Sequence, residues 1–567
     1  SGETSAATAV PLTRADLEAW LDGAIPIALE RGDLAGAVVA VVKDGEVLLT
    51  KGYGYSDVAA KKPMDAQRTL VRPGSTSKVF TWTAVMQLYE QGKLDLDRDI
   101  NAYLDFRIDN PFDTPITLKH LMTHRGGFEE GLKSILMTDV ARFMTLEQYL
   151  KTHQRPLIHR PGEVPAYSNY GTALAGYIVQ RVSGEPFERY IERHIFEPLQ
   201  MQRSTFRQPL PESLQADMSH GYVQASESPR AFELLTTGPA GSLSTTAADM
   251  ASFMIAHLQE GRLGEASILQ PPTARLMRST LSPQVADFGM IAYGFFERHQ
   301  NGRHIVGHDG DTVVFHTDMY LLVDEGVGYF LSFNSRGAED SNYETRDAIF
   351  KGFMDRYFPN RSLESATHEE STAARDAQRI AGRYWSSRRV ESDFMSVFYV
   401  LQQVDITDGG DGTIGVPTFP TNEVRPYRET GPQVWREVNG SHAVALLERD
   451  GRKVVALSND PSSVLQSVPA WRSGSWNTPL LLIAIAVLLW ATIAWPVTEI
   501  SARMRAAAVL TGSDLRWHRF TRVATAFALA YLCGWVAVLA PILSNQLEVY
   551  DATLDPTLRL LQAATLL

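Results

Sequence analysis

A serine and a lysine three positions apart, Ser75 and Lys78, are the residues whose types and spacing best fit nucleophilic chemistry. Pro73 and Gly74 break whatever structure precedes them, so we expect a helix to begin near Ser75. Residues three apart share one helix face, which brings the lysine amine to the serine hydroxyl. Backbone N–H groups at a helix start carry partial positive charge and favour an oxyanion there. The pair therefore predicts a serine nucleophile with a lysine beside it.

The Ser-x-x-Lys string alone does not establish this chemistry. Such a string occurs about once by chance in a chain of this length, and its ordinary meaning is a helix cap with an exposed lysine. The residues behind it predict a buried helix because they are apolar at helical spacing: Val79, Phe80, Trp82, Val85, Met86, Leu88 and Tyr89. A catalytic interpretation needs partner groups elsewhere in the chain.

Two later stretches carry such partner groups. Tyr167 in Tyr-Ser-Asn offers a phenol that can move protons, and Asn169 can hydrogen-bond to a lysine or to a substrate amide. An oxyanion hole needs two N–H donors, of which Ser75 supplies one. The stretch that begins at His308 can supply the other, since Gly310 allows a close backbone approach. Each stretch alone is also consistent with an ordinary polar turn.

A pair of histidines four residues apart, His120 and His124, raises the possibility of a metal site. A zinc hydrolase of that spacing needs a glutamate after the first histidine, and Leu121 stands there instead. We therefore expect both histidines to bond to the backbone. An acidic glycine-rich loop at 408–412 lacks the ligand spacing of a calcium-binding loop and predicts a turn. We expect no metal and no cofactor.

The elements around these motifs predict one long domain, residues 14–361. Thr13 caps a first helix, and Asp44-Gly45 turns a hairpin that a strand near 52–55 follows. Helices and loops fill the middle of the domain. Three strands, at 312–316, 319–323 and 328–333, come before a closing helix at 345–357. Strands at both ends with helices between them predict a mixed sheet built from both termini of the domain.

Beyond this domain the composition changes. Residues 362–375 are polar and predict a linker. Residues 376–470 predict a small β-rich domain of unknown role, because strand-like runs alternate with turn signals. The strand-like runs are 399–406, 434–438, 443–448 and 453–457.

Two apolar runs in the tail region 476–567, residues 479–497 and 523–542, are each long enough to cross a bilayer. The loop between them is rich in arginine, which predicts a cytoplasmic loop and an extracytoplasmic catalytic domain. Its arginines are Arg503, Arg505, Arg516, Arg519 and Arg522. We expect a third span to start within 557–567. We interpret residues 1–13 as a mature N-terminal segment from which an export signal has been removed.

The overall composition bounds the remaining functions. The formal net charge of −12 argues against a large nucleic-acid footprint. The single cysteine, Cys533, excludes a disulfide between two residues of the chain. The sequence leaves the oligomeric state open.

Taken together, the three motifs Ser75-x-x-Lys78, Tyr167-x-Asn169 and His308-x-Gly310 resemble in order and spacing those of the serine β-lactamase-related hydrolases. That family includes class C β-lactamases, D,D-peptidases, D-aminopeptidases and some esterases, and the resemblance covers about residues 14–357. It implies an α/β fold in which a mixed antiparallel sheet flanked by helices lies beside a helical region, with the site between them.

The resemblance also implies roles for the motif residues. Ser75 is the expected nucleophile and Lys78 its base partner, while Tyr167 relays protons to the leaving group and helps to activate the deacylating water. Which of the two takes the first proton stays open. Asn169 and His308 are expected to contact substrate. The family geometry puts the second oxyanion donor at the backbone N–H of Asp311.

The third motif departs from the family pattern, which is commonly Lys-Thr-Gly where this chain has His308-Asp309-Gly310. A lysine there gives a fixed charge for a substrate carboxylate, whereas a histidine is weaker in that role at neutral pH. Penicillins are therefore less favoured as natural substrates. Histidine at this position is familiar among peptidase and esterase members of the family.

The membrane tail resembles membrane-anchored periplasmic peptidases of the family, such as the prodrug-activating D-asparagine peptidases. The linearised-microcystin peptidase has a similar motif layout. We expect a serine peptidase or amidase that acts on peptide-like substrates, anchored in the bacterial inner membrane with its catalytic domain in the periplasm. An esterase, a β-lactamase or D,D-carboxypeptidase, and a non-enzymatic β-lactam or peptide sensor stay open as alternatives.

Overall fold

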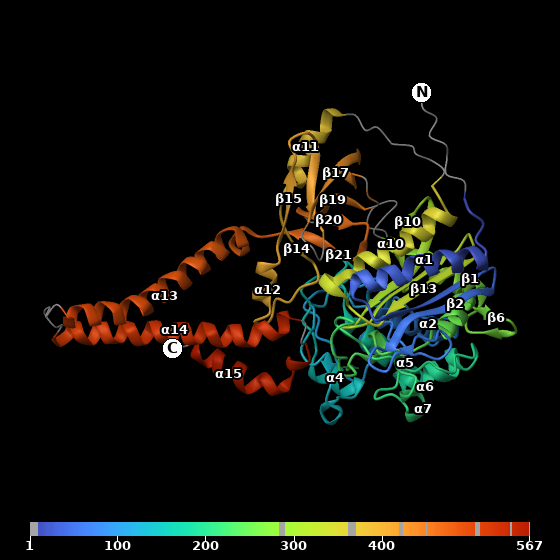
Figure 1. Ribbon diagram of the computed structural model, residues 1–567, viewed down its shortest axis with the longest axis horizontal. Coiled ribbons are helices and arrows are strands. Elements are labelled where there is room, and N and C mark those ends of the chain that lie inside the picture. The colour runs from blue at the N-terminus through green and yellow to red at the C-terminus, as the bar shows by residue number, and fades with distance from the viewer. Residues whose placement is uncertain are drawn as a thin grey trace. The chain divides into compact units, whose positions relative to one another are not determined.

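In the computed structural model of the chain (Figure 1), the described residues are 9–282, 290–360, 370–418, 423–438, 440, 442–449, 451–504, 511–544 and 547–565. The chain forms two compact units. The first comprises residues 1–131, 138–393 and 404–467, and the second comprises residues 132–137, 394–403 and 468–567.

A nine-stranded sheet forms the centre of the first unit, in the order β3-β2-β1-β13-β12-β11-β10-β9-β8. The strands from the chain start are β1 (Gly36–Lys43), β2 (Glu46–Asp57) and β3 (Lys62–Pro63). The later strands are β8 (Thr280–Ser282), β9 (Met290–Ala292), β10 (Phe296–Gln300), β11 (Arg303–Asp311), β12 (His316–Leu322) and β13 (Val327–Phe333). β1 pairs antiparallel with β13, which confirms a sheet built from both ends of the domain.

Two details of the predicted strands were wrong. The strand expected near 52–55 is the second half of β2, which continues without a break from the Asp44-Gly45 hairpin. The strand expected at 312–316 is mostly the turn between β11 and β12. The hydroxyl of Thr312 accepts hydrogen bonds from the N–H groups of Val314 and Phe315, which bends the chain there.

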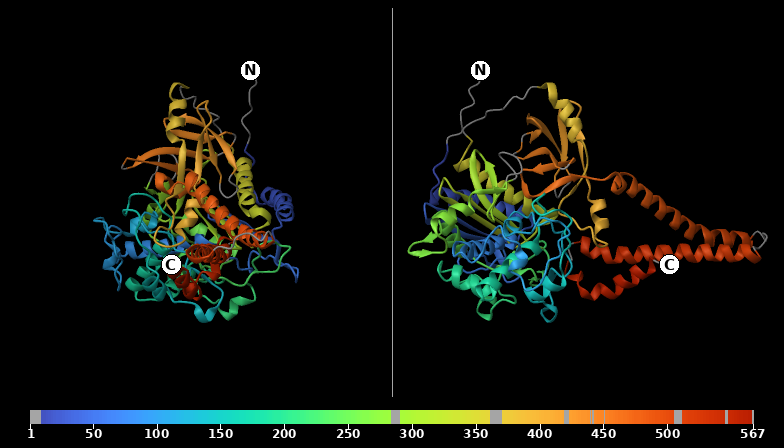
Figure 2. Two further views of the ribbon diagram at one scale, coloured as in Figure 1. Left: turned by 90° about the vertical axis from the view of Figure 1, so that its left-hand side faces the viewer. Right: turned by 180° about the vertical axis from the view of Figure 1, so that it is seen from behind.

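Helices cover both faces of this sheet. Alternate residues of β1 point to opposite sides, so that Val39 and Val41 pack with helices α1 (Arg14–Gly32) and α10 (Ser341–Tyr357). These two helices lie side by side over one face (Figures 1 and 2). Val38 and Val42 pack on the other face with α8 (Ala247–Leu258) and the helical region. The resulting fold is the β-lactamase/transpeptidase-like α/β fold that the resemblance implied.

The helical region is built around α2 (Ser77–Glu90) and α5 (Asn169–Ser183), which pack against each other. Ser77 to Leu88 of α2 are all buried, as the apolar run after Lys78 predicted, but Tyr89 at the end of that run is exposed because the helix leaves the core there. The shorter helices of this unit are α3 (Leu118–Met122), α4 (Leu146–Thr152), α6 (Phe187–Ile191), α7 (Glu212–Gln215) and α9 (Pro271–Met277). A small hairpin is formed by β6 (Arg262–Leu263) and β7 (Ala266–Ser267).

The β-rich domain is a closed eight-stranded barrel of β14–β21. Its strands are β14 (Gly382–Ser386), β15 (Val404–Asp408), β16 (Thr413–Pro417), β17 (Val424–Gly431), β18 (Val434–Glu437), β19 (Ala443–Arg449), β20 (Arg452–Leu457) and β21 (Asp460–Ser467). Trp435 and Tyr384 are buried in its core. The expected strand at 399–406 is correct only from Val404, because its first residues end helix α12 (Ser396–Leu401).

The predicted linker falls partly outside the described residues. Residues 362–369 are not described, and residues 370–375 belong to helix α11 (Glu370–Ile380), which leads into β14. The mature N-terminal segment lies outside the described residues up to position 8.

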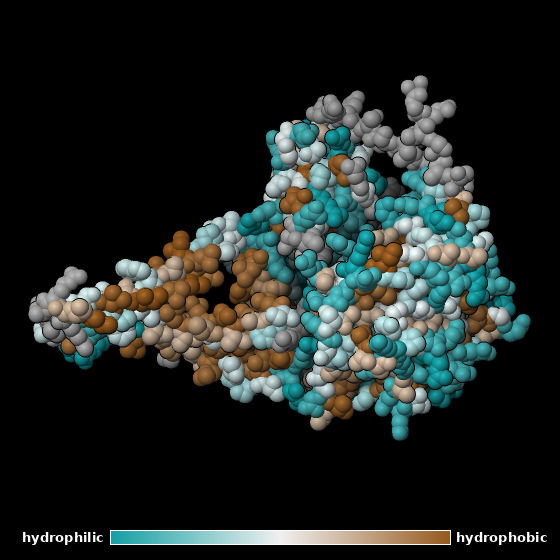
Figure 3. All heavy atoms as spheres, viewed as in Figure 1, coloured by the Kyte–Doolittle hydropathy of each residue, from teal (hydrophilic) through white to brown (hydrophobic). Residues whose placement is uncertain are grey.

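The second unit contains two long helices, α13 (Gly474–Met504) and α14 (Gly512–Leu543), and a shorter one, α15 (Asp555–Ala564). Both long helices are of a length and composition that could cross a membrane, and they include the predicted runs 479–497 and 523–542. Their most apolar stretches are 0% and 11% buried, and hydrophobic side chains gather on their surface (Figure 3). The loop residues 505–510, with Arg505, and residues 566–567 of the third expected span lie outside the described residues.

Candidate active site

The Ser75 turn is held between strand β11 and helix α2. Gly74, Ser75 and Thr76 form a 3₁₀ turn, η1 (Gly74–Thr76), and α2 follows directly, so the helix begins where the sequence predicted. The Thr76 hydroxyl donates to the carbonyl of His308 at 3.0 Å, which fastens the turn to β11. Gly74 and Thr76 are buried while Ser75 is partly exposed. The turn therefore presents the serine hydroxyl at the surface of a packed core.

Strand β11 approaches this turn at Gly310 more closely than a side chain would permit. A Cβ atom at Gly310 would lie 1.8 Å from the carbonyl oxygen of Pro73 and 2.8 Å from the backbone nitrogen of Ser75. A Cβ atom on Gly74 would likewise lie 2.7 Å from the backbone nitrogen of Asp311. Both glycines are needed for this contact, and the main chains of Ser75 and Asp311 meet there.

Lys78 is fully buried and has three polar neighbours. Its Nζ lies 3.0 Å from Ser75 Oγ, 2.7 Å from Asn169 Oδ1 and 2.8 Å from the carbonyl oxygen of Ala240. Burial lowers the pKa of Lys78 well below its usual value, and the positive charge of Arg388 lowers it further. Both effects shift the balance from the ammonium toward the neutral amine.

Tyr167 lies on the other side of the serine hydroxyl. Its Oη donates to Ser75 Oγ at 2.6 Å, and Lys78 Nζ lies 4.7 Å from the centre of its ring. Burial raises the pKa of Tyr167 above its usual value, although the hydrogen bond to Ser75 opposes this shift. The phenol is therefore protonated at neutral pH. Asn169, two residues further, is the first residue of α5, and Ser168 caps that helix through the Gly171 N–H.

The two histidines considered as a metal pair bond to the backbone, as predicted. His120 Nδ1 accepts from the Thr117 N–H and His124 Nδ1 accepts from the Ser168 N–H, both at 3.3 Å. The ring centroids of His124 and Tyr167 lie 4.3 Å apart, so the imidazole packs against the phenol ring. Within the described ranges, no three His, Cys, Asp or Glu side chains are grouped in a way that could hold a metal ion.

His308 faces the same site in a neutral form. Its Nδ1 donates to the carbonyl oxygen of Asp309 at 2.5 Å, and its ring stacks on Phe296 at 4.3 Å between centroids. Burial, with the nearby Lys78, lowers the pKa of His308 to about 3. It therefore supplies no positive charge near pH 7. The Asp311 carboxylate is bound by Arg346 Nη2 at 3.0 Å, so Asp311 meets the site through its backbone.

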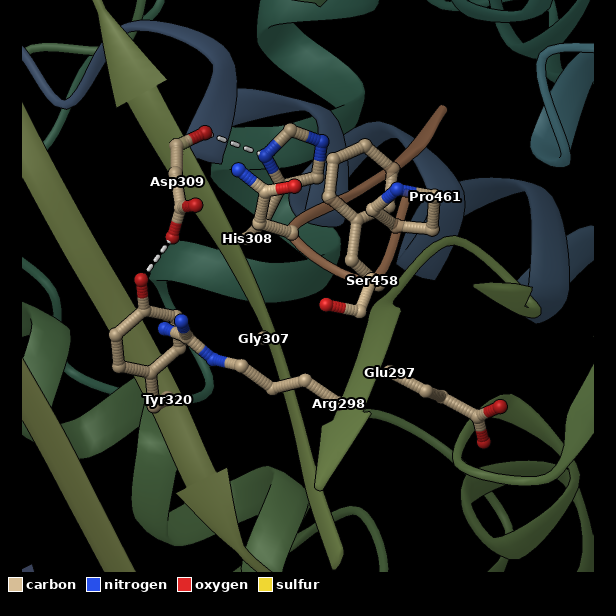
Figure 4. Close-up of a pocket in the computed structure, with 10 residues that line it drawn as sticks. Glu297, Arg298, Gly307, His308, Asp309, Tyr320, Ser458 and Pro461 are labelled. Atoms are coloured by element: carbon tan, nitrogen blue, oxygen red, sulfur yellow. Dashed lines mark hydrogen bonds between the residues drawn. The ribbon is translucent and has the colours of Figure 1, made fainter. Parts of the chain in front are cut away.

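A pocket with an empty volume of about 360 Å³ adjoins His308 (Figure 4). One wall comes from β10–β12, where the Arg298 guanidinium lies 3.7 Å from the centre of the Tyr320 ring and the Tyr320 hydroxyl donates to Asp309. The opposite wall is Ser458, Asn459 and Pro461 at the β20–β21 turn of the barrel. Catalytic domain and barrel thus enclose this pocket together.

The structure brings all seven candidate residues together, but sequence reasoning missed several neighbours. Ala240 lies in the short 3₁₀ turn η5 (Gly238–Ala240), and none of the three sequence motifs includes its carbonyl. Arg388, between β14 and α12, places its guanidinium 4.6 Å from the centre of the Tyr167 ring and pairs with Glu130. Neither residue lies in a recognisable motif, so only the tertiary structure reveals them.

A family model described as Beta-lactamase matches residues 21–352, more than half of the chain. The chain belongs to this family. Its fold and its Ser-x-x-Lys motif are typical of the family, and the barrel and the apolar helices follow the matched region.

Among curated relatives, the chain is 32% identical to Protein flp of Staphylococcus aureus (strain MW2) over 203 residues, which are 34% of this chain and 39% of that protein. It is 33% identical to the putative penicillin-binding protein PbpX of Bacillus subtilis (strain 168) over 172 residues, which are 29% of this chain and 40% of that protein. The chain thus spans about two fifths of the length of these curated relatives.

Solved structures share the fold over a longer part of the chain. SurE in complex with D-Leu aligns with a TM-score of 0.54 and 18% identity, covering 80% of this chain and 99% of SurE. The octameric penicillin-binding protein homologue from Pyrococcus abyssi aligns with a TM-score of 0.51 and 22% identity, covering 79% of this chain and 100% of that protein. At these identities the likeness concerns the fold alone.

Proposed function

We propose that this chain is a serine peptidase or amidase that hydrolyses a peptide or amide bond through an acyl-enzyme on Ser75. The observation that carries the proposal is the placement of Ser75 Oγ, 3.0 Å from Lys78 Nζ and 2.6 Å from Tyr167 Oη. A hydroxyl between a buried amine and a buried phenol has a base and an acid within proton-transfer distance.

Lys78 is the base that takes the first proton. Its neutral amine has two N–H bonds and one lone pair. Asn169 Oδ1 and the Ala240 carbonyl accept the two N–H bonds, which directs the lone pair to the Ser75 hydroxyl. The Ser75 proton passes to Lys78 as Oγ attacks the substrate carbonyl carbon. The protonated phenol of Tyr167 does not compete for that proton.

Tyr167 is the acid for the leaving group. Its proton passes to the leaving nitrogen as the C–N bond breaks, and the proton held by Lys78 then restores the phenol. A water molecule hydrolyses the acyl-enzyme by the same transfers in reverse. The oxyanion of each tetrahedral intermediate is stabilised by the backbone N–H groups of Ser75 and Asp311, whose main chains meet beside Gly310.

The neutral His308 bears on the substrate class. A buried imidazole with a pKa of about 3 offers no charge to the carboxylate of a penicillin at neutral pH. This favours peptide-like substrates over β-lactams. A β-lactamase/D-alanine carboxypeptidase from Pseudomonas syringae has a similar fold (18% identity, TM-score 0.50).

The apolar helices α13 and α14 support an anchored form of the enzyme. We infer that they span the bacterial inner membrane, that the arginine-rich loop between them is cytoplasmic, and that the catalytic unit is periplasmic. A periplasmic position gives access to peptide-like substrates outside the cytoplasm.

The test labels the full chain in detergent with a fluorophosphonate serine probe, then compares hydrolysis of matched amide and ester substrates with D- and L-residues. We expect Ser75→Ala to abolish labelling. Ser77→Ala is the control, because the Ser77 hydroxyl donates to the Gly74 carbonyl, and this variant should keep the labelling. Labelling that survives Ser75→Ala would overturn the nucleophile. Turnover of esters without any amide cleavage would make the chain an esterase, and acylation without turnover would make it a sensor.

A further inference from the structure

The chain segment between β14 and α12 enters the catalytic centre from outside the matched family region. Its residue Arg388 lies 36 positions beyond the end of that region at residue 352. The guanidinium carbon of Arg388 is 4.6 Å from the centre of the Tyr167 ring, whose hydroxyl donates to Ser75. A guanidinium at that distance is attracted to the face of an aromatic ring.

The position of Arg388 is fixed on both sides along the chain. On one side, the Ser387 hydroxyl donates to the carbonyl of Pro165 at 2.5 Å, in the loop that carries Tyr167, and the His159 imidazole donates to the Ser387 carbonyl at 3.0 Å. On the other side, the backbone of the catalytic domain holds the segment, since the Glu130 N–H donates to the Arg389 carbonyl at 3.0 Å. The segment therefore belongs to the site rather than to a loose linker.

Glu129 secures the far end of the same segment. Its carboxylate accepts from the backbone N–H groups of Glu391 and Ser392 at 2.9 and 3.0 Å, and it also accepts from the Ser392 hydroxyl. Glu129 is 1% exposed, so this carboxylate is satisfied by the segment alone in a place without bulk water.

Arg388 is in turn held by an acidic partner. Its Nε donates to the Glu130 carboxylate, whose other oxygen accepts from the Gly131 N–H at 2.9 Å. The Glu130 side chain is 3% exposed and that of Arg388 is 41% exposed. The ion pair is anchored at its buried end, which leaves the guanidinium in one orientation against Tyr167.

We propose that Arg388 is a positioning residue of the catalytic centre: clamped by Glu130, it holds the Tyr167 ring in place and sets a permanent positive charge beside the Ser75–Lys78 pair. This inference rests on the proposed function. The inference also gives the segment between β14 and α12 a role in catalysis. This segment is joined to barrel strand β21, because the Val464 N–H donates to the Ser387 hydroxyl and the Ser387 N–H donates to the Val464 carbonyl.

The charge of Arg388 acts on Lys78 together with the other groups around it. The titratable and charged groups that influence Lys78 and Tyr167 are His124, Glu130, His308, Asp311 and Arg388. Arg388 opposes protonation of Lys78 and lowers the pKa of that amine, whereas Glu130 raises it. Because Lys78 must be neutral to accept the Ser75 proton, the low-pH limb of the acylation rate reports this balance.

The test measures the second-order rate of fluorophosphonate labelling of Ser75 between pH 5 and 10 in the full chain. We expect Arg388→Gln to move the low-pH limb upward by about one pH unit, as removal of a unit charge within roughly 10 Å does at an effective dielectric constant of about 20. Glu130→Gln should move the limb in the opposite direction. Arg388→Lys should leave the limb near its wild-type position but reduce the plateau rate about threefold to tenfold, since an ammonium lacks the planar face of a guanidinium.

Arg383→Gln is the matched control, because Arg383 also forms an arginine–carboxylate pair, with Asp405 at 2.6 Å on the barrel. It should leave the limb and the plateau unchanged. Thermal unfolding of each variant confirms that it is folded before the rates are compared. A wild-type limb in Arg388→Gln, or an equal displacement in Arg383→Gln, would overturn the inference. Labelling that survives Ser75→Ala would contradict the proposed function itself. Labelling that requires Ser75, together with a wild-type low-pH limb in Arg388→Gln, would contradict only the role of Arg388.

Discussion

Two apolar helices of this chain, α2 and α13, have opposite surroundings. Every residue of α2 from Ser77 to Leu88 is buried by protein, and this includes Lys78. The most apolar stretch of α13 has no buried residues, although leucine, isoleucine and tryptophan dominate it. An apolar run therefore has two meanings. Where other parts of the chain cover the apolar run and pair its polar groups, the helix becomes part of the core. Where no part of the chain covers the run, we infer that lipid does.

The largest expected effect comes from the buried polar residue of α2. Lys78→Ala removes the base beside Ser75 and should reduce the rate of probe labelling by about 10³-fold. Thr492→Ala on α13, where the hydroxyl donates to the Leu488 carbonyl in its own helix, should leave the rate unchanged. The labelling rate of purified variants checks this contrast. A rate of Lys78→Ala within tenfold of wild type would remove Lys78 from the chemistry.

Replacement of one aromatic residue by alanine should lower the stability of the protein much more in α2 than in α13. Phe80 of α2 is fully buried and stacks on Phe253 with ring centroids 3.8 Å apart, so Phe80→Ala should lower the free energy of unfolding by about 3–5 kcal/mol. Trp490 of α13 is 73% exposed, and Trp490→Ala should change the stability of the catalytic unit by less than about 0.5 kcal/mol. Denaturant unfolding in detergent measures both, and similar losses for the two variants would contradict the contrast.

A charged residue introduced into α13 tests whether this helix lies in a membrane. Leu489 of α13 is 46% exposed near the centre of the run, and Leu489→Arg should disfavour membrane insertion by about 2.5–3.5 kcal/mol. Leu489→Phe serves as the control, because it keeps the residue apolar. Carbonate extraction of membranes measures the inserted fraction. Equal retention of the arginine variant and the control would argue that α13 does not span the bilayer.

The smallest expected effect, taken for a change of one pH unit, is a pH dependence of stability that comes from a histidine packed against α2 and has no counterpart on α13. His257 is buried beside Thr83 of α2, and burial lowers its pKa to about 3. The folded state therefore binds fewer protons than the unfolded state between pH 6.5 and 3, so its stability is complete above pH 6.5 and falls with acidification by about 1.4 kcal/mol per pH unit. His257→Gln should lower the slope of pH-dependent unfolding by this amount, because other buried histidines such as His308 keep their own contributions, while α13 contains no histidine that could contribute.

The candidate site residues could be predicted from the sequence because each motif is short and local. Ser75 and Lys78 share one helix turn, Tyr167 and Asn169 share one loop, and each pair has a recognisable spacing. Strands β1, β2, β12 and β13 were predictable for the same reason, since apolar runs and turn signals lie next to one another in the chain, whereas β8 and β9 were not predicted.

The missed parts depend on contacts between distant segments. The Arg388–Glu130 pair joins residues 258 positions apart, and the pocket beside His308 takes one wall from Ser458. No local pattern marks such residues. The expected strand at 312–316 failed for a different reason, because a threonine hydroxyl that bonds to nearby N–H groups outweighed the strand preference of the β-branched residues around it.

The contact between Gly310 and the Ser75 turn makes β11 intolerant of any change in length. Side chains alternate along this strand: His308 faces Lys78, while the carboxylate of Asp309 bonds to Tyr320 on the opposite side. Deleting one residue before His308 would bring an acidic side chain to the place where the glycine now admits the serine turn. Natural variants of this protein should therefore carry substitutions in β10 and β12 far more often than insertions or deletions in β11.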